Sequence, residues 1–350
     1  PFLCITCLLL MVWSVIPRWG AATESTLPVS STTPTFIVPV PRRVLVLNSY
    51  HPGMRFSDDE VQGIRSALPS GTEIFLEYMD SKRVQGESYN AQLAQLYAMK
   101  YKNAYFDTIF SLDDDALRFL LKHGQQLFAN TPVVFCGVNA LQPGMLDHQL
   151  PMTGVLETID IETSLDFALR LLPNTKIILV ITDPTTTGAA NRHTLEQLSR
   201  SGRFTQPMDF LDQSGTGLTL AELQIALQQA NTDAIVYLAD FSVDRFGNTI
   251  NIDTLMPLLA QTTHRPIFVH NSMYMGLGAL GGKLNSGFDQ GVSAGKLALR
   301  IWEGTLPSAI PVVTDNGNRV MIDDQQRARW KIPPNNVAAA AGVPHSEIVF

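Results

Sequence analysis

Charge is sparse in this chain, and positive charge is the scarcer sign. Of the 350 residues, 25 are Lys or Arg and 32 are Asp or Glu, and charged residues make up 16% of the total. The formal net charge of −7 has the wrong sign for a protein that binds nucleic-acid phosphates, so no nucleic-acid partner is expected. Hydrophobic residues make up 45%, a globular share that excludes disorder over most of the chain.

Cysteine is also nearly absent. Cys4 and Cys7 lie in an apolar N-terminal run, which leaves Cys136 alone in the body of the chain. A lone cysteine forms no internal disulfide, and it excludes a cysteine metal cluster. The seven histidines show no metal-ligand spacing. We therefore expect neither a metal ion nor another cofactor.

The first 41 residues differ from the rest of the chain. Phe2–Ile16 is an apolar run that is shorter than the roughly 20 residues that normally span a bilayer. The small residues Gly20, Ala21 and Ala22 follow it, as at a cleavage site. Residues 1–22 therefore predict a signal peptide or a membrane anchor, and both alternatives place the remainder outside the cytoplasm. Residues 23–41 are rich in Ser, Thr and Pro, which predicts an extended tether.

From Arg42 onward, apolar runs typical of buried strands alternate with amphipathic helical segments. This alternation predicts the α/β class with parallel sheets covered by helices on both faces. The predicted strands are 44–48, 73–78, 108–111, 133–136, 177–182, 234–238, 267–270, 310–313 and 319–322. The predicted helices are 57–68, 88–101, 114–128, 161–172, 191–201, 220–230, 252–263 and 290–302. Ser57 and Glu60 have the spacing of a capping box at the first helix.

The alternation pauses at residues 139–160 and then starts again, which predicts two similar lobes. We expect residues 42–157 plus 283–325 in lobe 1 and residues 158–282 in lobe 2. Residues 326–350 are expected to form a C-terminal extension that continues beyond Phe350.

Two short motifs suggest enzyme chemistry but lack its structural setting. Gly276–Gly281 matches G-x-G-x-x-G, yet no helix start follows it, so it predicts a glycine-rich crossing between lobes. Gly291–Gly295 matches G-x-S-x-G, but it lies in a predicted helix rather than after a strand. Its small residues therefore predict close helix packing.

Polar residues follow nearly every predicted strand. In open parallel sheets, ligands bind beyond the carboxyl ends of the strands, so this pattern predicts a binding cleft. The alternative, that all of these residues only form turns, stays open. So does an α/β enzyme that uses Asp113 and Asp114 with His51 or His270. The polar groups are Asn48–His51, Asp113–Asp114, Gly137–Asn139, Thr182–Asp183, Asp240 and Asn271–Ser272.

Five segments together resemble a known family. It is the ABC-transporter substrate-binding protein family with the type I periplasmic-binding fold. Within it, the likeness is greatest to extracytoplasmic sensor domains of bacterial histidine kinases and diguanylate cyclases. The segments are VLVLNSYHPG at Val44–Gly53 with SDDEVQGI at Ser57–Ile64, LDDDA at Leu112–Ala116, TPVVFCGVN at Thr131–Asn139 and GFDQG at Gly287–Gly291.

The resemblance implies two Rossmann-like lobes joined by crossings near 157–160, 272–285 and 310–318, with a small polar solute between them. An aromatic side chain would stack on the solute and carboxylates would meet an ammonium group. No arginine pair is evident for a carboxylate, and Arg55 is the nearest candidate. By position, the implied ligand-binding residues are Ser49, Tyr50, Asp113, Asp114, Asn139, Asp183, Asp240 and Asn271, and His51 lies beside the first of them.

This set predicts a non-enzymatic, extracytoplasmic solute-binding domain held at the membrane by its N-terminal segment. The main interpretation is the sensory input of a membrane kinase or cyclase. The alternative is the binding component of an ABC importer, with a permease as its partner, and the second alternative is the exported enzyme. A homodimer stays open.

Overall fold

The computed structural model describes residues 41–139, 141–142, 144–146, 150–230, 233–314, 318–344 and 348–349. The predicted signal peptide or anchor lies outside these residues, as does the predicted tether apart from Pro41. Within the described part of the chain, no helix combines the length and the apolar character needed to cross a membrane.

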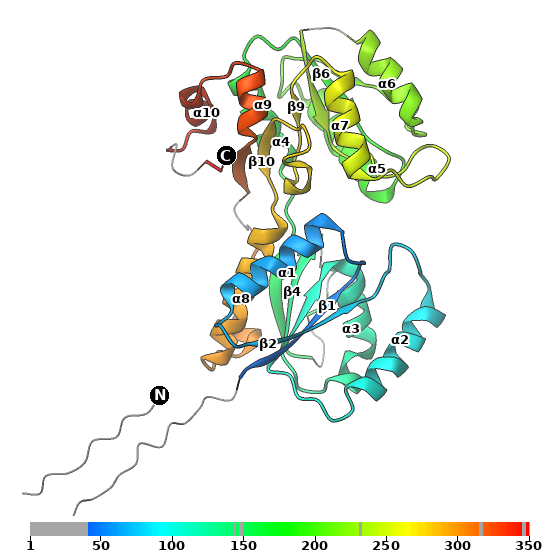
Figure 1. Ribbon diagram of the computed structural model, residues 1–350, viewed down its shortest axis with the longest axis vertical. Coiled ribbons are helices and arrows are strands. Elements are labelled where there is room, and N and C mark those ends of the chain that lie inside the picture. Colours follow the sequence, from blue (N-terminus) through cyan, green and yellow to red (C-terminus); the bar gives the residue numbers. More distant parts are fainter. Residues whose placement is uncertain are drawn as a thin grey trace, which may run out of the picture. The chain divides into compact units, whose positions relative to one another are not determined.

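The first sheet has five parallel strands in the order β2-β1-β3-β4-β5 (Figure 1). Strands β1, β3 and β4 are almost entirely buried, because their apolar side chains are covered on both faces of the sheet. The bounds are β1 (Arg43–Asn48), β2 (Glu73–Tyr78), β3 (Thr108–Leu112), β4 (Val133–Val138) and β5 (Met152–Leu156).

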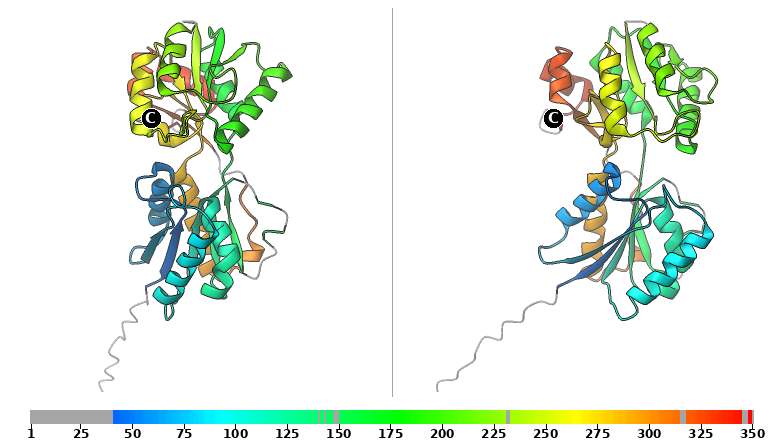
Figure 2. Two further views of the ribbon diagram at one scale, coloured as in Figure 1. Left: turned by 90° about the vertical axis from the view of Figure 1, so that its right-hand side faces the viewer. Right: turned by 45° about the vertical axis from the view of Figure 1, so that its right-hand side comes forward.

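Alternate side chains of β1 enter two different cores. Val44 and Val46 pack with α1 (Arg55–Ala67) and α8 (Gly287–Trp302). Leu45 and Leu47 pack on the other face, where α2 (Glu87–Lys100) and α3 (Asp113–Leu127) lie. Figures 1 and 2 show these helix pairs on opposite sides of the sheet. We call this sheet with its four helices the first lobe.

The second sheet has six strands in the order β7-β6-β8-β9-β10-β11. All neighbours are parallel except β11, which pairs antiparallel with β10. Its strands are β6 (Ile177–Ile181), β7 (Met208–Phe210), β8 (Ala234–Leu238), β9 (Ile267–Phe268), β10 (Gly281–Leu284) and β11 (Arg319–Ile322). Its helices are α4 (Ile161–Leu171), α5 (Thr186–Ser201), α6 (Leu220–Gln229), α7 (Ile252–Thr262), α9 (Asp324–Arg329) and α10 (Pro334–Ala341). Short 3-10 helices span Ser272–Tyr274 and Pro307–Ala309. We call the second sheet with its six α-helices the second lobe.

The predicted α/β class with two parallel sheets is confirmed. The five parallel strands of the second sheet repeat the winding order of the first, with β6 and β8 in the places of β1 and β3. Asp113, which follows β3, and Asp240, which follows β8, therefore occupy equivalent places in the two lobes.

The segment predicted to return to lobe 1, residues 283–325, is divided between the two sheets. Helix α8 packs against α1 and the first sheet, whereas β10 and β11 belong to the second sheet. The predicted extension also packs into the second lobe, because Ile332, Val337 and Ala340 join its core. The predicted strand 310–313 contributes an isolated bridge from Val313 to β5.

The predicted capping box at Ser57 is wrong. Helix α1 begins at Arg55, so Ser57 lies inside the helix and its hydroxyl donates to the Met54 carbonyl. Glu60 is fully buried, and its side chain approaches Gly137 rather than the helix start. Both side chains are therefore buried inside the lobe instead of capping the helix.

Helices α1 and α8 pack at backbone distance through glycines. A Cβ added at Gly291 would lie 2.0 Å from the Glu60 carbonyl oxygen, and one at Gly63 would lie 2.1 Å from the Phe288 carbonyl oxygen. No side chain fits at such distances, so glycine is required at both positions. This close packing fulfils the prediction made from the small residues of G-x-S-x-G.

We expect Gly291→Ala to destabilise the protein, although alanine normally favours a helix by about 1 kcal/mol over glycine. The added Cβ would push α1 and α8 apart, and such overpacking costs about 1–3 kcal/mol. Urea unfolding measures the effect, with Lys296→Ala on the exposed side of α8 as the control. Equal or greater stability of Gly291→Ala would contradict the packing described here.

Candidate functional site

A cavity of about 500 Å³ lies where loops from both sheets meet. Three of the predicted site residues line it, namely Tyr50, Asp114 and Asn139. The second lobe contributes Thr186 and Thr187 at the start of α5. The remaining lining residues are Ser81, Lys82, Val84, Gln85, Gly86, Asn90, Asp115 and Arg118.

Tyr50 and Lys82 form the cationic and aromatic part of the cavity wall. The Lys82 ammonium lies over the Tyr50 ring, 4.7 Å from its centroid. Burial, and then the charges of nearby carboxylates led by Asp113, raise the pKa of the Tyr50 hydroxyl, so it stays protonated. The sequence analysis did not include Lys82. It follows β2, and the strand-end rule applied to that strand would have found it.

Asp113 is the first residue of α3, and its backbone is in the left-handed region at φ 66°. Its side chain is buried, and Oδ2 has no hydrogen-bond partner among the described residues. Desolvation by burial, followed by the negative charge of Glu157, raises the pKa of Asp113. A strained backbone and a buried polar atom without a partner are features that cluster at functional sites.

The other two carboxylates of the Asp113–Asp115 run already have partners. Asp114 accepts a hydrogen bond from the Asn139 amide nitrogen at 2.7 Å, which fixes both side chains at the cavity wall. Asp115 accepts from the Ser81 hydroxyl at 2.5 Å and forms an ion pair with Arg118. The run is therefore more than a helix cap, because its members have three different environments.

Glu60 and Asp113 both approach Gly137. A Cβ at Gly137 would lie 2.5 Å from Glu60 Oε1 and 3.0 Å from Asp113 Oδ1. The glycine therefore allows two buried carboxyl groups to approach the same stretch of backbone. Burial, and then the charge of Asp113, raises the pKa of Glu60.

Glu157 lies on the crossing that leaves the first sheet after β5. It accepts a hydrogen bond at 2.6 Å from Asn285, which lies on the crossing that leaves β10. The two crossings are thus tied together. Desolvation and the charge of Asp114 raise the pKa of Glu157 to about 7. The sequence analysis placed this residue at the end of lobe 1 and gave it no role.

The two predicted acids of the second lobe differ sharply. Burial, and then the charge of Asp183, raises the pKa of Asp240 to about 7. Asp183 instead accepts hydrogen bonds from both the backbone N–H and the hydroxyl of Thr185, from the same two groups of Ser242, and from the Val243 N–H. Its lone pairs are occupied, so it ties together the loops after β6 and β8.

Of three further predicted residues, Ser49 and Asn271 form hydrogen bonds in local structure, whereas His51 only lies near an acid. The Ser49 hydroxyl donates to the Leu112 carbonyl at 2.6 Å and accepts from the Ala116 N–H at 2.8 Å. His51 Nδ1 lies 3.5 Å from Asp80 Oδ1. The Asn271 side chain accepts from the Met273 N–H and caps a 3-10 helix.

Arg55, the predicted partner of a ligand carboxylate, is paired within the chain. It lies 2.9 Å from Asp253 of α7 at an exposed position. His270, a candidate of the enzyme alternative, is buried beside Tyr237, and desolvation lowers its pKa to about 4. It is therefore neutral, and no hydrogen bond joins it to Asp113 or Asp114 among the described residues.

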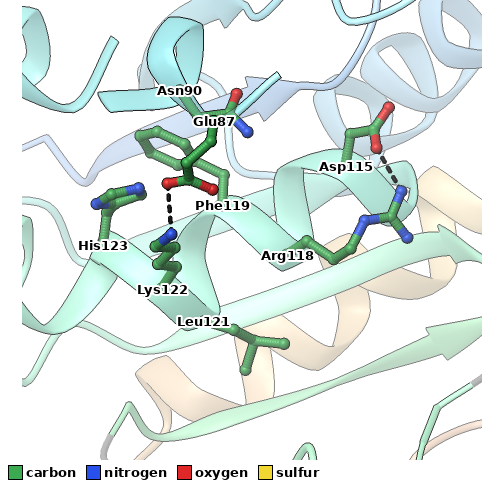
Figure 3. A pocket seen from close by; sticks show the side chains of 8 residues that line it. All are labelled: Glu87, Asn90, Asp115, Arg118, Phe119, Leu121, Lys122 and His123. Carbon is green, nitrogen blue, oxygen red and sulfur yellow. Dashed lines mark hydrogen bonds and ion pairs between the residues drawn. The ribbon is translucent and has the colours of Figure 1, made fainter. Parts of the chain in front are cut away.

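A second hollow of about 500 Å³ lies between α2 and α3 and shares Asn90, Asp115 and Arg118 with the strand-end cavity (Figure 3). Its charged side chains pair with one another, Lys122 with Glu87 and Arg118 with Asp115. No group of acidic, histidine or cysteine residues in the described ranges has the arrangement of a metal site. The strand-end cavity is therefore the stronger candidate.

Comparisons with known proteins identify the family and the fold. The family model described as ABC transporter substrate binding protein matches residues 49–341. An ABC domain from Streptococcus pneumoniae in complex with L-Trp has a TM-score of 0.54 at 15% identity, over 89% of this chain and 100% of that chain. A substrate-binding protein with adhesive properties from Clostridium difficile, in a ligand-free, open structure, has a TM-score of 0.59 at 14% identity, over 89% and 98%.

A conserved domain protein from Vibrio cholerae has a TM-score of 0.51 at 17% identity, over 87% of this chain and 99% of that chain. At these identities the structures show a shared fold only. No curated protein sequence matches the chain.

The raised pKa of Glu157 predicts a specific dependence of stability on pH. Its ordinary pKa is 4.5, so between pH 4.5 and 7 the folded chain holds a proton that the unfolded chain has lost. This contribution to stability is fully present below pH 4.5 and is lost as the pH rises through 7. Relative to the wild type, Glu157→Gln should therefore gain stability between pH 5 and pH 8, by at most about 1.4 kcal/mol per pH unit.

Denaturant unfolding at several pH values measures this difference. Glu303→Gln, at an exposed position after α8, is the matched control and should follow the wild type. Parallel pH profiles for Glu157→Gln and the wild type would show that the Glu157 carboxyl is not perturbed.

Proposed function

Because the chain belongs to the ABC transporter substrate-binding protein family, we propose that it binds one small polar solute in the strand-end cavity and delivers it to an ABC importer. The observation that carries this proposal is the cavity itself, whose walls come from loops of both sheets. A solute that contacts both walls favours the closed arrangement of the lobes, since closure adds contacts.

The cavity wall has the composition expected of a binding site. Tyr50 offers an aromatic face, and Lys82, Asp114 and Asn139 offer charged and amide groups. Its volume falls in the range typical of small-molecule sites, about 300–1,000 Å³. We assign ligand contact to Tyr50, Asp114 and Asn139, and to Asp113 and Asp240, which lie at equivalent strand ends. Ser49 and Asp183 act instead by holding the loops in place.

The crossings supply the hinge in this proposal. Glu157 and Asn285 join two of them by a hydrogen bond of 2.6 Å. The type I neighbours described above include one structure in complex with L-Trp and one that is ligand-free and open. We infer that this chain also alternates between open and closed arrangements.

The sensor role, our main interpretation of the sequence, remains a prediction. The family match favours the alternative, the importer component, because the matched family is one of transport proteins. Fusion to a kinase or cyclase, homodimerisation and membrane attachment through residues 1–22 likewise remain predictions. Loss of solute uptake on deletion of the gene, with signalling unchanged, supports the importer role.

The enzyme alternative is not proposed. The matched family consists of substrate-binding proteins rather than enzymes, and its members act outside the cytoplasm. Asp113 and Asp114 are therefore assigned to binding.

A thermal-shift screen of amino acids, sugars and small organic acids tests the proposal. We expect at least one compound to stabilise the chain, by about 2.7 kcal/mol at a 100-fold excess over Kd. Tyr50→Ala should weaken the binding of that compound about 10-fold, because burying a large apolar side chain contributes about 1.5–3 kcal/mol and 1.4 kcal/mol is a factor of about 10 in affinity. Isothermal titration measures the affinity.

The matched control is Tyr105→Ala, since Tyr105 is 70% exposed and does not line the cavity. Its affinity should equal that of the wild type. If both variants lost affinity equally, or if neither lost affinity, the strand-end cavity would not be the binding site.

A further inference from the structure

We propose that the solute carries a protonated nitrogen, as in an amine or a guanidine, and that this group binds above Tyr50, where the Lys82 ammonium now lies. The inference rests on the proposed function and specifies its substrate class. It follows from three features of the cavity, namely the position of Lys82, the balance of charges and the state of Asp113.

The Lys82 ammonium occupies the position that we propose for the cationic nitrogen of the solute. Its ammonium lies 4.7 Å from the centre of the Tyr50 ring, within the range of a cation–π contact. Its positive charge lowers the pKa values of Asp113, Glu157 and Asp240, which belong to both lobes. An aromatic face surrounded by carboxylates is the chemistry that recognises an organic cation. The Lys82 side chain is exposed, so a ligand can displace it toward solvent.

Acidic side chains outnumber basic ones around this position. Asp113, Asp114, Glu157 and Asp240 follow strands, and Glu60 approaches Asp113 at Gly137. The nearby arginines are engaged elsewhere, Arg118 with Asp115, Arg83 with Asp80 and Arg55 with Asp253. A carboxylate or phosphate entering the cavity would be repelled, whereas a cation would gain from each acid.

Asp113 does not line the cavity itself, but its charge raises the pKa of Tyr50, and its carboxyl group has a vacant acceptor. Its side chain is 4% exposed, and Oδ2 has no hydrogen-bond partner among the described residues. Asp183 is equally buried, but it accepts five hydrogen bonds from neighbouring loops. Leaving a buried carboxyl oxygen without a partner costs about 1–3 kcal/mol, and a ligand N–H group would remove that cost.

The first test identifies what the protein holds. The full chain, purified without denaturant, is examined by native mass spectrometry and its released solute is identified. In parallel, a thermal-shift panel compares amines with the alcohols and carboxylates of the same skeleton, for example 1,4-diaminobutane, 1,4-butanediol and succinate. We expect a bound or stabilising compound with a cationic nitrogen, and no shift from its neutral and acidic counterparts.

Removal of Lys82 gives a result whose sign distinguishes the ligand classes. For an amine probe, Lys82→Met should raise the affinity at least about 3-fold, since it removes a competing ammonium of like charge. For an anionic ligand the same substitution would lower the affinity. Lys102→Met, at an exposed position after α2, is the control and should leave affinity unchanged.

Asp113→Asn should lower the affinity for the same amine at least 10-fold, with Asp233→Asn as the exposed control. If Asp113→Asn does not fold, the change in amine affinity caused by Lys82→Met still tests the inference. A neutral or anionic solute, or weaker amine binding by Lys82→Met, overturns the inference and leaves the proposed function standing. If no solute is released and no compound stabilises the chain, both fail.

Discussion

The parallel pairing of strands, repeated in one winding order, is the constraint on which the rest of this structure depends. Parallel strands deliver all of their carboxyl ends to the same edge of a sheet. Because β6 and β8 repeat the places of β1 and β3, Asp113 and Asp240 stand at equivalent edges of the two lobes. The cavity follows from this repetition, since loops of both sheets line it.

Burial of carboxyl groups without a matching positive charge sets the chemistry of the site. Desolvation and mutual repulsion raise the pKa values of Asp113, Glu157 and Asp240, and their one common cation among the described residues is Lys82. Asp183 is the opposite case, because its buried carboxylate accepts hydrogen bonds from neighbouring loops, including those from Thr185 and Ser242. Asp113 Oδ2 has no such partner among the described residues, and in the proposal a group of the ligand supplies one.

Much of the architecture could be predicted because apolar runs such as Val44–Asn48 are covered on both faces and read plainly as strands. The strand-end rule then found Tyr50, Asp114 and Asn139, which line the cavity. The rule could not distinguish these cavity residues from Ser49, whose hydroxyl donates a hydrogen bond to the carbonyl of Leu112, 63 positions away. Residues that form turns, residues that hold loops together and residues that contact a ligand are of the same types. Only their hydrogen-bond partners in the folded structure distinguish the three roles.

The sequence by itself determined the alternation of strands and helices, because side-chain periodicity is a local property. Tertiary structure decided the rest. Strand β7 has only three residues, β10 begins with two glycines and β5 has a glycine at its centre, so none of them has a clear strand pattern of its own. Lys82 follows β2 and Glu157 follows β5, but neither segment shows which side chains these residues will meet. Their roles arise because the winding order brings the ends of distant strands together, and no local pattern records which charges will meet there.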